Sequence, residues 1–162
     1  NEYARHKYAA ECYALSYPEA IVIRTSILGT KKPRSVSLVD WAINNLRAGV
    51  AMTLFDDVWT SSIDVKSFAK SAWDIFWDHN YRGRVNIAAS EVYSKAKLIK
   101  SLGEALNLNL NNCITGKAYL QTQRATHLGL DVSKAENVLG YGLPSLDEVI
   151  KKIVSDPEIV SH

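Results

Sequence analysis

Residues 3–28 read YARHKYAAECYALSYPEAIVIRTSIL, and this stretch decides the fold class. Its first part, residues 3–16, is rich in alanine and has no glycine or proline before Pro18, so it predicts a helix. Residues 20–28 form a short, nearly continuous apolar run that is typical of a parallel-sheet strand covered on both faces. Because α/β proteins bind ligands at the carboxyl ends of such strands, we expect a ligand edge where this run ends.

The rest of the chain continues the alternation of helix and strand, which predicts the α/β class. Two expected strands, 20–28 and 84–89, are fewer than a doubly wound sheet needs, so we expect only a portion of such a sheet. The other expected elements are a helix over about 36–48, a strand over 51–55, a helix capped by Asp64, a helix over about 94–106, and two helices beginning at the capping boxes Ser133/Glu136 and Ser145/Glu148. The Asp64 helix is expected to bury one apolar face made of Val65, Phe68, Ala69, Ala72, Ile75 and Phe76.

Composition excludes several classes of protein. Hydrophobic residues make up 47% of the chain and charged residues 22%, with a net charge of +2, which is typical of a globular protein. No lysine or arginine cluster predicts nucleic-acid binding, and no apolar run is long enough to predict a membrane span. Cys12 and Cys113 lie too far apart to suggest a metal site, so we expect no metal and a reducing, cytoplasmic location.

The spacing Tyr-x-x-x-Lys places Tyr3 and Lys7 on the same helix face, one turn apart. A tyrosine hydroxyl has a pKa near 10, and a neighbouring cation favours its ionised form, so such a pair can act in acid–base chemistry. The spacing alone is weak evidence, because Tyr93 and Lys97 repeat it later in the chain. Whether either pair is catalytic depends on its context.

In that context, YARHKYAAE followed by IVIRTSILG resembles the catalytic helix and next strand of the extended short-chain dehydrogenase/reductases, most closely the dTDP-4-dehydrorhamnose reductase group. The similarity continues in order through LFDDVWTSSIDVKSFA, VNIAAS and RATHLGLDVSKAENVLGYGLPSLDEVI. It implies the C-terminal portion of an NAD(P)-binding Rossmann-like doubly wound sheet plus a small α/β substrate-binding lobe. On that basis, Rossmann-type elements occupy 1–34 and 64–92, and the substrate-binding lobe occupies 35–63 and 93–162.

The resemblance also implies roles for single residues. Tyr3 would be the general acid in ketone reduction, and Lys7 would favour its ionised form and bind the nicotinamide ribose of NADPH or NADH. Tyr3, Thr25 and Ser26 would contact the cofactor as well. The nucleotide-sugar substrate would lie against Ile27, Trp59 and Arg124. The other tryptophans, Trp41, Trp73 and Trp77, are on helical segments and are expected to pack inside the protein.

The chain departs from the family pattern in ways that keep alternatives open. Ile27 stands where the reductases usually carry a tryptophan, and Ser62 and Ala125 replace prolines. The glycine-rich turn that holds the cofactor pyrophosphate is not among these residues, so we expect that the N-terminal cofactor-binding half is absent and that this chain alone is inactive. Expected partners are a homodimer mate or that missing half. A non-catalytic regulatory subunit, similar to that of methionine adenosyltransferase, and a nucleotide-sugar epimerase or dehydratase remain open.

Overall fold

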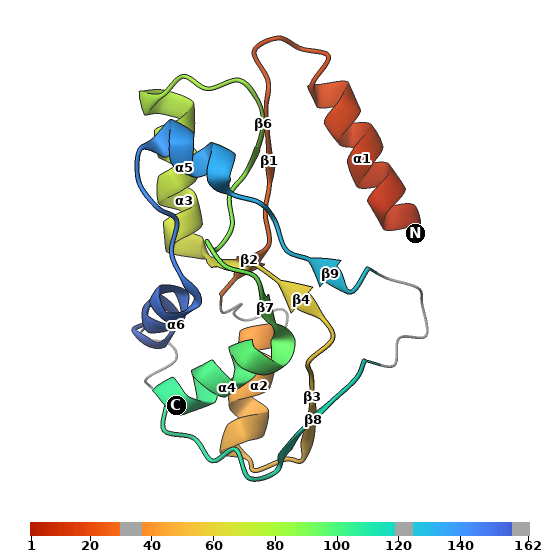
Figure 1. The fold of residues 1–162 in the computed structure, drawn as a ribbon, viewed down its shortest axis with the longest axis vertical. Coiled ribbons are helices and arrows are strands. Elements are labelled where there is room, and N and C mark those ends of the chain that lie inside the picture. The colour runs from red at the N-terminus through yellow and green to blue at the C-terminus, as the bar shows by residue number, and fades with distance from the viewer. Residues whose placement is uncertain (30–36, 119–124, 157–162) are drawn as a thin grey trace.

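The computed structural model describes residues 1–29, 37–118 and 125–156, and helices alternate with short strands through them (Figure 1). The first half contains α1 (Glu2–Ala14), β1 (Ile21–Arg24), β2 (Ile27–Leu28), α2 (Leu38–Arg47), β3 (Met52–Phe55), β4 (Trp59–Thr60), β5 (Ile63–Asp64), α3 (Val65–Trp73) and the π-helical turn η1 (Asp74–Asp78). The second half contains β6 (Gly83–Asn86), β7 (Tyr93–Ser94), α4 (Lys95–Ala105), β8 (Cys113–Gly116), β9 (His127–Leu128), α5 (Ser133–Leu139) and α6 (Leu146–Val154). None of these helices is long and apolar enough to cross a lipid bilayer.

Parallel pairing dominates the sheets, as the sequence predicts. β1 pairs with β6, β2 with β5 and β3 with β8, all in parallel. β4 lies between β7, which is antiparallel to it, and β9, which is parallel. In the described residues β1 has a partner strand on one edge only. The α/β class is therefore confirmed, with a narrow sheet.

The expected strand over 20–28 is wrong in one respect, because it divides into β1 and β2. The ladder with β6 ends at Arg24, and the Ser26 carbonyl then accepts a hydrogen bond from the Ile63 backbone N–H at 2.8 Å. This bond begins the pairing of β2 with β5. The break places Thr25 and Ser26 between two ladders, at the carboxyl end of β1.

Local capping signals fix most helix starts. Ser37 and Ser145 form capping boxes with Asp40 and Glu148, and Asp64 accepts a bond from the Ser67 backbone N–H. The expected box at Ser133 is wrong, because Glu136 instead accepts from the Leu143 backbone N–H at 2.9 Å. The α5 helix ends at Gly140, whose φ of +71° is the left-handed conformation that favours glycine.

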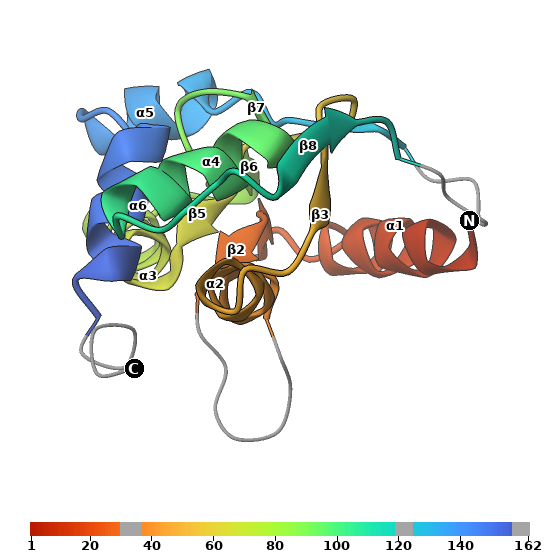
Figure 2. The same ribbon diagram turned by 90° about the horizontal axis from the view of Figure 1, so that it is seen from below.

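Two clusters of buried side chains hold these elements together. One joins α2, β3, α4 and α6, and the other joins β5, η1, β6 and α5. The helices α3, α5 and α6 lie on one side of β1 and β6, and α1 lies on the other, in both views of the molecule (Figure 1, Figure 2). Helix α1 contributes a single buried residue, Glu11.

The buried face of α3 differs from the expected one. Val65 is 53% exposed and Phe76 44%, whereas Ser67 and Ser71 are almost fully buried. The helix instead turns its serines inward because α6 and the loop before it supply hydroxyl and ammonium partners for them. The expected apolar face is therefore confirmed in part. Phe68, Ala72 and Ile75 pack into the cluster around Ile63 and Val85, whereas Val65 and Phe76 do not.

The expectation that the helical tryptophans are internal is also wrong. Trp41, Trp73 and Trp77 are all exposed by 41% or more. Trp73 and Phe76 each pack against Trp77, with ring centroids 5.7 Å and 4.6 Å apart. These three aromatic rings form a patch on the surface at the end of α3.

Candidate functional site

A chain of hydroxyl groups lies at the carboxyl end of β1. The Ser26 Oγ lies 2.8 Å from the Ser62 Oγ, which lies 2.8 Å from the Thr60 Oγ1. Ser62 and Thr60 are buried. Each hydroxyl can both donate and accept a hydrogen bond. The three hydroxyls therefore form a continuous hydrogen-bonded row from the end of β1 to β4. A proline in place of Ser62 could not take part in these hydrogen bonds, because it has no hydroxyl.

Thr25 contributes a second polar group to this edge. Its Oγ1 is buried and has no hydrogen-bond partner in the described residues. Leaving a buried hydroxyl unpaired costs about 1–3 kcal/mol. The unpaired hydroxyl beside Ser26 is compatible with a polar ligand at this strand end. A nicotinamide cofactor would be such a ligand, so the residues present fit it.

Tyr3 and Lys7 lie in the first two turns of α1, where the Asn1 side chain caps the helix by accepting from the Ala4 backbone N–H at 3.0 Å. Both are exposed, Tyr3 by 73%. Neither side chain bonds to another residue in the described ranges, so the structure does not bring them into contact with Thr25 or Ser26. Because α1 and β1 run in opposite directions, the start of α1 and the end of β1 lie at the same end of the pair (Figure 1).

An ion-pair cluster that sequence reasoning missed attaches α1 to the sheet. The Arg24 Nε and Nη2 donate to the Glu11 carboxylate at 2.8 Å each, and the Arg84 Nε donates at 2.5 Å. The pKa of Glu11 is lowered, first by the hydrogen bond from Arg24, against the desolvation that burial imposes. The signal in the sequence was a glutamate in an otherwise exposed helix and an arginine at the end of the next strand. The pairing of Val22 with Arg84 then brings the second arginine to the same face.

The second Tyr-x-x-x-Lys pair is structural. Tyr93 is fully buried, and its hydroxyl donates to the Ser62 carbonyl at 2.5 Å. Burial raises the pKa of the Tyr93 hydroxyl, which disfavours its ionised form. Lys97 turns away to bond the Glu91 carboxylate at 3.2 Å.

The expected substrate residues have different surroundings. Ile27 is 46% exposed on β2, where it pairs with Ile63 of β5. The Trp59 ring is half-buried and stacks on His127, with the two planes 17° apart. Arg124 lies outside the described residues, so its expected role stays a prediction.

The acidic pair Asp56 and Asp57 does not gather other ligands. The Asp57 Oδ1 accepts a bond from the Ala118 backbone N–H at 2.9 Å, which ties two loops together. Within the described ranges, no group of three or more histidine, cysteine, aspartate or glutamate side chains could hold a metal ion.

Sequence comparison identifies no relative of this chain, because no protein-family model and no curated protein match it. Solved structures do match. A hypothetical dTDP-4-dehydrorhamnose reductase from Sulfolobus tokodaii is 22% identical, with a TM-score of 0.76 over 91% of this chain and 52% of that chain. The dTDP-4-dehydrorhamnose reductase of Bacillus anthracis, solved in complex with NADP, is 16% identical, with a TM-score of 0.83 over 94% of this chain and 54% of that chain.

An epimerase has the same architecture. UDP-N-acetylglucosamine 4-epimerase from Methanobrevibacter ruminantium, in complex with UDP-N-acetylmuramic acid, is 17% identical, with a TM-score of 0.68 over 94% of this chain and 53% of that chain. At these identities the likeness concerns the fold. The chain therefore has the Rossmann-like α/β fold of the nucleotide-sugar reductases and epimerases, and it spans about half the length of those proteins.

Proposed function

We propose that this chain is part of an NADPH-dependent reductase that acts on a nucleotide-linked 4-keto-6-deoxy sugar. The observation that carries the proposal is the placement of Tyr3 and Lys7, one turn apart at the start of α1, at the same end as the polar strand edge of β1. The fold shared with two dTDP-4-dehydrorhamnose reductases supports the choice of substrate class.

In this mechanism NADPH, when bound, supplies a hydride to the C4 carbonyl of the sugar. Tyr3 donates its hydroxyl proton to the C4 oxygen, and the Lys7 ammonium favours the tyrosinate that remains. Lys7 also holds the ribose hydroxyls of the cofactor. Thr25 and Ser26 hold the nicotinamide end, where the unpaired Thr25 hydroxyl offers a hydrogen bond.

On the substrate side, the exposed Ile27 packs against the sugar, and Trp59 borders the nucleotide beside its stacked partner His127. Arg124 binds the diphosphate, because a planar guanidinium suits pairs of phosphate oxygens. The smaller Ile27 in place of tryptophan gives the sugar a wider site.

The cofactor pyrophosphate is held by a second, N-terminal half that pairs with the open edge of β1. Three observations support this arrangement. β1 has one partner strand in the described residues, α1 buries only Glu11, and Tyr8 and Tyr13 on this helix are exposed. A partner strand on β1 would extend the parallel sheet, and the rest of that half could cover exposed surface of α1.

Two alternatives follow from particular observations. The shared fold with an epimerase favours a second candidate, an epimerase or dehydratase that uses the same tyrosine and lysine. The missing tryptophan at Ile27 favours a third, a non-catalytic binding subunit.

One assay separates the three candidates. The complete protein is incubated with NADPH and dTDP-4-keto-rhamnose, and both cofactor absorbance and sugar product are followed. A reductase consumes one NADPH for each product molecule. An epimerase or dehydratase that first oxidises a sugar hydroxyl leaves this ketone unchanged, and it converts a nucleotide sugar only in a second reaction supplied with NAD⁺, without net change in the cofactor. Binding of NADPH with no sugar chemistry on any nucleotide sugar, together with a stable protein complex, would contradict the proposal in favour of the binding subunit.

A further inference from the structure

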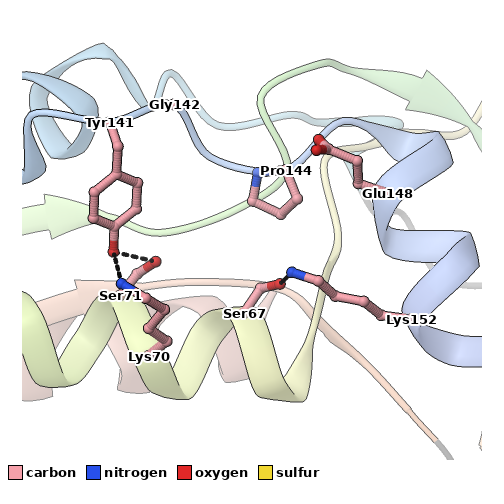
Figure 3. Close-up of a pocket in the computed structure, with 8 residues that line it drawn as sticks. All are labelled: Ser67, Lys70, Ser71, Tyr141, Gly142, Pro144, Glu148 and Lys152. Atoms are coloured by element: carbon pink, nitrogen blue, oxygen red, sulfur yellow. Dashed lines mark hydrogen bonds between the residues drawn. The ribbon is translucent and has the colours of Figure 1, made fainter.

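A hollow of about 130 Å³ lies on the side of β1 and β6 opposite α1, between α3, the segment Tyr141–Pro144 and α6. Figure 3 shows Ser67, Lys70 and Ser71 entering it from α3, Lys152 from α6, and Tyr141 from the segment between α5 and α6. Since a water molecule occupies about 30 Å³ in the liquid, the hollow has room for a small polyatomic ion. None of its residues belongs to the proposed reductase site.

Lys152 brings an ammonium group into this hollow, where its charge helps to lower the pKa of Glu148, after the hydrogen bonds from Ser145, but makes no direct ion pair with it. Its Nζ donates to the Ser67 Oγ at 2.6 Å, and within the described ranges it makes no ion pair. An ammonium has three N–H donors, so two remain available. Lys70 differs, because its Nζ bonds the Asp74 carboxylate at 2.6 Å, which raises the pKa of Lys70 and lowers that of Asp74.

The two serine hydroxyls also have protons to donate. Ser67 accepts from Lys152, and its own hydroxyl proton has no acceptor in the described residues. Tyr141 donates its single phenolic proton to the Asp74 carboxylate at 2.6 Å. It therefore has no proton left for the Ser71 Oγ, which lies 3.4 Å from the Tyr141 hydroxyl. Ser67 and Ser71 are one turn apart and almost fully buried, so both hydroxyls are held on the inner face of α3.

We infer that this hollow, here named the α3–α6 pocket and defined by Ser67, Ser71, Tyr141 and Lys152, binds a phosphate group. Its free hydrogen-bonding groups are donors, which an oxyanion with several acceptor oxygens satisfies better than a neutral or cationic ligand does. Glu148 lines the same pocket and opposes the anion, although its carboxylate is engaged by the Ser145 backbone N–H at 2.8 Å. The bound phosphate is therefore held chiefly by Lys152 and the two serines.

The test is an NMR titration of the complete protein with inorganic phosphate, against chloride at equal ionic strength and without NADPH or nucleotide sugar. We expect saturable shifts of the backbone amides of Ser67, Ser71 and Gly142. Lys152→Met weakens the apparent affinity about tenfold, because it removes a charged donor. Lys151→Met is the matched control on the same helix and leaves the affinity unchanged.

Two further variants test the pocket from opposite directions, one that weakens binding without a change of net charge and one that strengthens it. Ser71→Ala weakens phosphate binding several-fold at constant net charge, and Glu148→Gln strengthens it by removing the repulsion. A parallel titration with methyl phosphate distinguishes a phosphate ester from free phosphate, and binding of either supports the pocket. Shifts that do not saturate, or an equal loss in Lys151→Met and Lys152→Met, would overturn the inference and leave the proposed reductase function unaffected.

Discussion

At the scale of single residues, two tyrosines with the same spacing to a lysine have opposite surroundings. Tyr3 is 73% exposed and bonds nothing in the described residues, whereas Tyr93 is fully buried and donates to the Ser62 carbonyl. An exposed hydroxyl can meet a substrate, and a buried one whose proton is already given to a carbonyl cannot. The surroundings therefore separate a candidate catalytic pair from a structural one.

This difference predicts opposite effects of the same substitution on stability. Tyr93→Phe leaves the buried Ser62 carbonyl without its donor, so we expect the free energy of unfolding to fall by about 1–2 kcal/mol. Tyr3→Phe changes it by less than about 0.5 kcal/mol, since surface changes without partners have small effects. Urea unfolding of the chain measures both. Equal losses in the two variants would contradict the structural role assigned to Tyr93.

At the scale of elements, α1 is attached to the sheet by the ion pairs of Glu11 with Arg24 and Arg84. Glu11→Gln leaves two guanidinium groups side by side without a carboxylate. We expect a loss of about 1–2 kcal/mol, below the 3–5 kcal/mol of a fully buried pair, because Arg24 is 42% exposed and solvent screens it. Hydrogen exchange of the α1 amides measures the release of the helix. Glu2→Gln is the control. Its ion pairs with Arg5 and His6 are on the exposed part of the same helix, so it changes exchange much less than Glu11→Gln does.

The same cluster predicts a pH dependence. The pKa of Glu11 is lowered from its ordinary value of 4.5 when the chain folds, so the native state favours its ionised form. The stabilisation is fully present above pH 4.5 and is lost as the pH falls through the lowered pKa. We expect the gap in unfolding free energy between the native chain and Glu11→Gln to close with acidification over this range. A gap that stays constant from neutral to acidic pH would contradict the ion-pair account.

Sequence reasoning located the elements better than it located their contacts. The helix starts at Asp64 and Ser145 were predictable because a cap bonds backbone groups only a few residues away, whereas the Ser37 capping box was not among the predictions. The inward serines of α3 were not, because their partners Tyr141 and Lys152 are about 70 and 85 residues distant. The break after Arg24 likewise depends on pairing with β5, far along the chain.

For the candidate site, the family resemblance predicts that Tyr3, Lys7, Thr25 and Ser26 form one group, and this stays a prediction. It did not identify Ser62 and Thr60, since a hydroxyl chain arises only when β1, β4 and β5 come together. The division into Rossmann-type elements and a substrate-binding lobe stays a prediction. The described residues contain two buried clusters, and α6 belongs to the one built on α2 and α4.

At the scale of the whole molecule, β1 has a partner strand on one edge only among the described residues, and α1 is exposed apart from Glu11. If a cofactor-binding half completes the sheet there, the 162-residue chain alone binds NADPH at least about 100-fold more weakly than the complete protein, because it lacks the pyrophosphate contacts. Isothermal titration of both proteins measures the difference. Tight binding of NADPH by the chain alone would contradict the missing-half account.

The most direct measurement of the central claim is the turnover of NADPH with dTDP-4-keto-rhamnose by the complete protein and its Tyr3→Phe variant. Tyr13→Phe, an exposed tyrosine on the same helix, is the matched control. The account predicts a fall in kcat of about 100- to 10,000-fold for Tyr3→Phe, the range expected when a general acid is removed, and native turnover for Tyr13→Phe. Turnover of Tyr3→Phe at the native rate would contradict the account.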